Sequence, residues 1–247
     1  MPGLLKTSNP ALNAKTFDRQ IAIGGESMTL QGTVNKTGFL LFCAAAAAAY
    51  TWWLVQTQPE SVALWMWGGV IGGFVLALVT IFKKEWSPVT APVYALCEGL
   101  ALGGISAVFN QAYPGIALQA LGLTAGVTAV MLLLYTSGMV RATPKFTMGV
   151  IAATGGIFLF YLVDIVMSFF GRHVPLLYSN GPWGIAISVF IVIVAALNLI
   201  LDFDFVETGV RQGAAKYMEW YGAFGIMVTL VWMYIEMLRL LSKLRSR

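Results

Sequence analysis

Charged residues are scarce in this sequence. Of its 247 residues, 11% are Asp, Glu, Lys or Arg and 58% are hydrophobic, whereas a soluble domain carries roughly 25% charged residues. The mean hydropathy is +0.78. A soluble domain could not cover its surface with so few charges, so the composition predicts an integral membrane protein that lies in the lipid bilayer.

Cysteine and histidine are almost absent as well. Cys43 and Cys97 both lie inside apolar runs, where we expect small buried side chains rather than a disulfide. His173 is the single histidine; it stands beside Arg172 in a polar stretch and is expected to be solvated. There is no Ser-His-Asp set, no metal-binding His/Cys spacing, no Walker loop and no dinucleotide fingerprint. We therefore expect neither enzymatic activity nor a cofactor.

Long apolar runs recur along the chain, and Pro and Gly punctuate the breaks between them. A helix that spans a bilayer needs roughly 20 apolar residues. Seven runs meet that requirement, at residues 37–56, 62–82, 90–112, 115–138, 146–170, 183–205 and 218–240. The prediction is an all-α bundle of seven transmembrane helices.

Polar ends flank this bundle. Residues 1–36 lack the compact apolar core and cleavage site of a signal peptide and are expected to form a polar N-terminal tail. The transmembrane domain is predicted at 37–240, and residues 241–247 form a short basic C-terminal tail.

The distribution of Lys and Arg predicts a cytoplasmic N-terminus. The formal net charge of +4 is attributed to cytoplasmic loops, not to nucleic-acid binding. In this orientation Arg172 is the only basic residue of the outer loops. The inner segments hold ten: Lys6, Lys15, Arg19, Lys36, Lys83, Lys84, Arg141, Lys145, Arg211 and Lys216. The basic C-terminal end disagrees, because seven crossings place it outside; either it is a tolerated exception or a late segment re-enters. We favour seven crossings, because 218–240 is long enough to span.

Six acidic residues fall inside the predicted spans. Asp202 and Asp204 end a long run without charge, and ionised carboxylates cost several kcal/mol there unless they are paired or hydrated. The predicted orientation places both in the inner half of the membrane with Glu98 and Glu219. Asp164 and Glu236 fall in the outer half, where Arg239 follows Glu236 by three residues and can pair with it.

Clustered carboxylates in a low dielectric share protons, and hard oxygen ligands suit calcium. The inner acids are therefore candidate sites for proton sensing and for cations, with Asp202 as the calcium ligand. Asp202 and Asp204 are two residues apart, so on a regular helix they point about 200° apart. One of them could simply lie near the lipid headgroups.

Four stretches resemble the bacterial branch of the Bax inhibitor-1 family. The resemblance covers nearly the whole chain from about residue 28. The stretches are Met28–Lys36, Tyr94–Gly103, Asn198–Glu207, and Tyr217–Gly225 with Leu230–Glu236.

The resemblance implies a pH-gated calcium leak through an aspartate pair on the sixth and seventh helices. It also implies residence in the bacterial inner membrane, with calcium and protons as the species bound. Asp202 matches the sixth-helix aspartate. The seventh helix departs from the family pattern, because Phe224–Leu230 contains no acid; Glu219 or Glu236 would have to substitute. The alternative is a non-conducting stress-response regulator that binds a membrane protease or another membrane partner.

Overall fold

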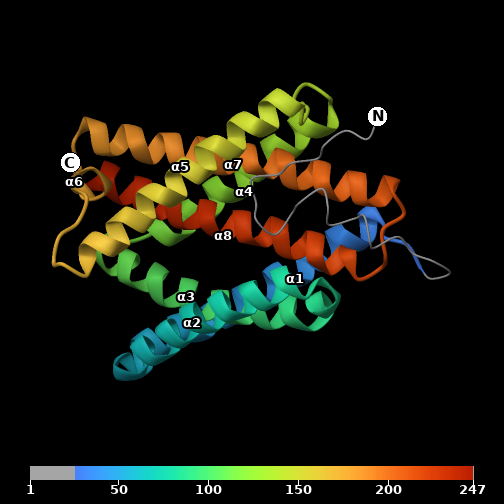
Figure 1. Cartoon of the computed structure of the whole chain (residues 1–247). Coiled ribbons are helices and arrows are strands. Elements are labelled where there is room, and N and C mark those ends of the chain that lie inside the picture. The colour runs from blue at the N-terminus through green and yellow to red at the C-terminus, as the bar shows by residue number, and fades with distance from the viewer. Residues whose placement is uncertain (1–25, 247) are drawn as a thin grey trace.

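A computed structural model gives the fold and describes residues 26–246. Seven of its helices are long and apolar enough to cross a membrane, which confirms the all-α prediction (Figure 1). They are α1 (Leu30–Thr57), α2 (Pro59–Phe82), α3 (Ser87–Ala112), α4 (Ile116–Thr136), α5 (Pro144–Ser168), α7 (Pro182–Arg211) and α8 (Met218–Arg245). Two short helices, η2 (Lys84–Trp86) and α6 (Pro175–Tyr178), lie between them.

Helices α7 and α8 form the centre of the bundle. The most apolar part of α7 is 61% buried and that of α8 is 50% buried, against 17% for α2, α4 and α5. The two helices pack along each other, while α1, α2 and α3 form a second group (Figure 1). Tyr94 of α3 meets Phe224 of α8 edge to face, with ring centroids 4.9 Å apart, and so joins the groups. Any acid on the inner face of α7 or α8 is therefore enclosed by protein.

Small residues bring α1 and α3 into close contact. A Cβ atom at Gly99 or Gly103 would collide with the backbone of Ala44 or Ala48 on α1. Lipid provides no hydrophobic drive between helices, so such close backbone packing holds the pair together. Gly122 of α4 makes no such contact, since nothing from a neighbouring helix lies within 4 Å of the position its Cβ would take.

Three helices extend at one end by five or more residues beyond the apolar runs. Helix α1 begins at Leu30 rather than 37, because the Thr29 side chain caps it by accepting from the Gly32 N–H. The segment 30–36 therefore belongs to the first helix, while residues 1–25 of the expected tail lie outside the described chain. At its C-terminal end, α7 continues to Arg211, and α8 likewise continues to Arg245.

The basic C-terminal residues are held by the protein. Lys243 is buried and donates to the Gly184 carbonyl at 3.0 Å and to Ser188 Oγ at 2.8 Å, both on α7. Arg245 donates to the Pro114 carbonyl at 2.8 Å. Helix α8 is uninterrupted along its whole length, as seven crossings require. Lys243 and Arg245 are thus engaged by the protein itself.

Candidate functional site

Asp202 is completely buried where α7 packs on α8. Its side chain is 0% exposed, and the Thr229 hydroxyl of α8 donates to Asp202 Oδ2 at 2.5 Å. Thr229 lies within the acid-free stretch 224–230 of the last helix. Thr229 is not an acid and was not predicted as a site residue. The signal that could have identified it is a threonine in the middle of the helix where the family resemblance leads us to expect an acid.

Asp204 faces away from Asp202. It is half-buried and lines a groove between α1, α4, α7 and α8, together with Glu207 one turn further along α7. Tyr135 of α4 donates a hydrogen bond to Glu207 Oε2, and Arg211 Nη1 lies 3.7 Å from Glu207 Oε1. The opposite orientations expected from a regular helix are thus found: one aspartate is in the core and the other faces the groove.

Glu98 of α3 is half-buried against α2. A Cβ atom at Gly73 would lie 2.8 Å from Glu98 Oε1, so the glycine makes room for the carboxylate. Tyr94, one turn earlier on α3, lies beside Glu98. Glu98 is thus placed at the α2–α3 contact.

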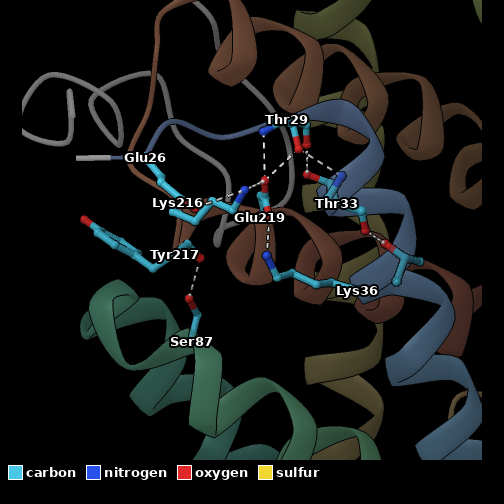
Figure 2. Close-up of polar contacts among 10 residues, drawn as sticks. Glu26, Thr29, Thr33, Lys36, Ser87, Lys216, Tyr217 and Glu219 are labelled. Carbon is cyan, nitrogen blue, oxygen red and sulfur yellow. Dashed lines mark hydrogen bonds and ion pairs between the residues drawn. The ribbon is translucent and has the colours of Figure 1, made fainter. Parts of the chain in front are cut away.

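Glu219 is the centre of a separate ionic cluster, which we name the Glu219 clamp: Glu219, Thr29, Lys36 and Lys216. Glu219 is 0% exposed. It accepts from the Thr29 backbone N–H at 2.9 Å and the Thr29 hydroxyl at 2.8 Å. Lys36 of α1 forms an ion pair with Oε2, and Lys216 Nζ lies 3.3 Å from Oε1 (Figure 2). Four contacts from two distant parts of the chain therefore hold this one carboxylate.

The clamp ties the start of α1 to the turn between α7 and α8. Gly213 makes that turn with a φ of 66°, a conformation that glycine adopts without strain. The Met28 N–H donates to the Ala214 carbonyl at 2.7 Å. The hydrogen bond with Glu219 and its negative charge raise the pKa of Lys216 above the ordinary value. The clamp therefore connects two parts of the fold that are distant in the sequence, the start of α1 and the α7–α8 turn, and this role is structural.

Asp164 and Glu236, which are predicted in the outer half of the membrane, are paired as well. Arg239 Nη1 lies 3.0 Å from Glu236 Oε1, and the Tyr161 hydroxyl of α5 donates to the same oxygen at 2.6 Å. Asp164 accepts from the Val174 N–H at 2.8 Å and lies 3.6 Å from His173, whose side chain is 55% exposed. At this end of the bundle the acids therefore fix α5 and its following loop against the core.

The structure does not gather the four inner acids into one site. Glu219 and Thr229 are ten residues apart on α8, which is about 15 Å along a helix, so the clamp and Asp202 lie at different depths. Residues 26–246 contain no group of three or more His, Cys, Asp or Glu side chains arranged to hold a metal ion. The proposed roles of these acids in proton or cation binding remain predictions.

The fold and the Asp202 site together define a seven-helix membrane protein with a buried carboxylate between its two central helices. A family model described as Bax inhibitor 1 like matches residues 9–246. The chain belongs to this family. Searches of curated proteins and of solved structures found no match.

Proposed function

We propose that this protein passes calcium, or cations generally, down their gradient across a membrane, under the control of protons that bind Asp202. The supporting observation is the placement of Asp202: a fully buried carboxylate on one central helix that accepts a hydrogen bond from Thr229 on the other. Family membership supports the same assignment. The bacterial inner membrane, with a cytoplasmic N-terminus, is the proposed location.

The chemistry follows from the cost of a buried charge. An ionised carboxylate in a low dielectric needs a proton, a cation or hydrogen-bond donors to offset its desolvation. Protons and calcium therefore compete for Asp202. Because Thr229 holds Asp202 against α8, a change in the charge of Asp202 alters the contact between the two central helices. Asp204 and Glu207 at the groove, and Glu98 at the α2–α3 contact, are the proposed further oxygen ligands.

The test is calcium flux into proteoliposomes between pH 6 and pH 8. Asp202→Asn keeps the shape of the side chain but cannot ionise, so we expect its flux to lose its dependence on pH. Thr229→Val removes the hydroxyl and should shift the pH dependence. Thr124→Val is the matched control, because the buried Thr124 hydroxyl of α4 makes no hydrogen bond within residues 26–246.

Equal flux and equal pH response in wild type and Asp202→Asn would remove Asp202 from the mechanism. No flux from wild-type protein at any pH would favour the alternative, a non-conducting regulator that binds a membrane protease or another membrane partner. In that case deletion of residues 1–27 should abolish capture of the partner.

A further inference from the structure

A large groove lies on the side of the bundle between α1, α4, α7 and α8, with a volume of about 1130 Å³. Apolar side chains line most of it. Four of them are exposed: Leu30 (49%), Val34 (63%), Leu41 (40%) and Leu132 (46%). Exposed apolar residues on helices that span a membrane face lipid. The groove is therefore open to the hydrocarbon part of the bilayer.

The length of the apolar wall fits one lipid leaflet. The groove-lining residues of α1 run from Leu30 to Leu41, which is about 16 Å along the helix. Half of the hydrocarbon core of a bilayer is about 15 Å. One acyl chain that lies along α1 would thus cover the wall from the membrane edge to the middle.

The edge of the groove is basic at the turn between α4 and α5. Arg141 lines it, and no carboxylate among residues 26–246 lies within ion-pair distance of its guanidinium. Thr143, which caps α5, lines the groove beside it, and Lys145 follows in the first turn. A helix N-terminus attracts anions through its exposed N–H groups and its dipole. Arg141 and the start of α5 therefore line one end of an apolar groove, and Lys145 lies in the first turn of the same helix.

The acids of the groove lie elsewhere. Glu207 is already engaged by Tyr135 and Arg211. Asp204 stands one turn earlier on α7, on the side nearer the middle of the helix. Arg211 lines the groove as well, but it is engaged by Glu207 and Thr208, so Arg141 is the lining cation that has no ion pair among residues 26–246.

We propose that this groove binds a phospholipid with an anionic headgroup. Its phosphate lies at Arg141, Lys145 and the start of α5, and one acyl chain fills the apolar wall between α1 and α4. A free phosphate would leave the apolar wall uncovered, and a zwitterionic lipid would bring a second cation close to Arg141 together with its phosphate. The inference concerns lipid binding and does not depend on calcium flux.

Native mass spectrometry of delipidated protein, titrated with phosphatidylglycerol or phosphatidylcholine, tests the proposal. Wild type should prefer phosphatidylglycerol, and Arg141→Gln should weaken that preference about fivefold, as expected for one basic side chain near a membrane surface. Arg172→Gln is the matched control. It removes another exposed loop arginine with no ion pair in residues 26–246 and should leave the preference unchanged.

A second variant tests the groove itself. Gly38 lines the groove and has no heavy atom within 4 Å of its Cβ position, so the side chain of Gly38→Leu begins in open space and occupies the groove. It should reduce binding of both lipids, whereas Gly68→Leu on α2, which also meets open space, should not.

Three results would overturn the proposal. The first is equal binding of the two lipids by wild type, and the second is an equal loss of lipid binding in the groove variants and in their controls. The third is that Arg141→Gln abolishes binding of inorganic phosphate but leaves lipid binding unchanged.

Discussion

Helix α8 carries two buried glutamates, one in its first turn and one in its C-terminal half, and the two are neutralised in different ways. Glu219 is 0% and Glu236 is 1% exposed. The cation of Glu236 is Arg239, three residues along the same helix. Glu219 is held by Lys36, which is 183 residues away in the chain. The Glu236–Arg239 pair lies within one helix, with Tyr161 of α5 as an added partner. The Glu219–Lys36 pair joins the start of the first membrane helix to the last one. The Glu219 end should therefore matter more for the stability of the fold.

The largest effect is expected from Glu219→Gln. The amide still accepts hydrogen bonds from Thr29, but Lys36 loses its counter-charge in a site where its side chain is only 17% exposed. Loss of one member of a buried ion pair costs about 3 kcal/mol or more. We expect that fall in the free energy of unfolding, measured in detergent micelles, together with faster hydrogen exchange at residues 28–36. Glu60→Gln, at an exposed acid on α2, is the control and should change neither quantity; equal stability of the two variants would contradict the comparison.

Gly32→Ala should break the same clamp from the other side. A Cβ atom at Gly32 would overlap the carboxylate of Glu219, so the carboxylate must move away from Thr29 and Lys36. Overpacking of this kind costs about 1–3 kcal/mol. The control is Gly38→Ala, also on α1, where the added methyl meets open space. It should be neutral or stabilising by about 0.5–1 kcal/mol. If both variants lose stability equally, helix backbone effects and not the clamp are responsible.

At the other end of α8, Tyr161→Phe should have a smaller effect. The Tyr161 hydroxyl donates to Glu236 and accepts from Arg239, but the ion pair between these two residues remains without it. Loss of a hydrogen bond to a charged group costs about 1.5–3 kcal/mol. Because the Glu236–Arg239 ion pair remains, we expect a loss of stability at the low end of this range. Tyr113→Phe, at a half-buried tyrosine whose hydroxyl has no hydrogen bond within residues 26–246, is the control in the same unfolding measurement. A loss larger than that of Glu219→Gln would reverse the order of the two ends.

The contrast between the local Glu236 pair and the long-range Glu219 pair also explains what the sequence could predict. The apolar runs predicted the seven helices because length and composition decide membrane spans. The Glu236–Arg239 pair was predictable because residues three apart share a helix face. The Glu219 clamp was not, since no local pattern indicates that Lys36 approaches a residue on the last helix. Thr229 was missed for the same reason. The predicted depth of the acids in the membrane wrongly suggested that acids at a similar depth lie together.

The smallest effect within the clamp is expected from Lys216→Gln. Lys216 is about half exposed, and its ion pair with Glu219 is therefore weakened by water, while Lys36 remains in place. The raised pKa of Lys216 means that the pair contributes fully below the ordinary value of 10.5 and is lost only as the pH rises through the higher folded value. The difference in melting temperature between wild type and this variant should thus be small and constant from pH 6 to pH 9. A difference that changes within that range would mean that Lys216 titrates there. If it stays constant, a pH response of the protein near neutrality must come from another group, and Asp202 is the first to examine.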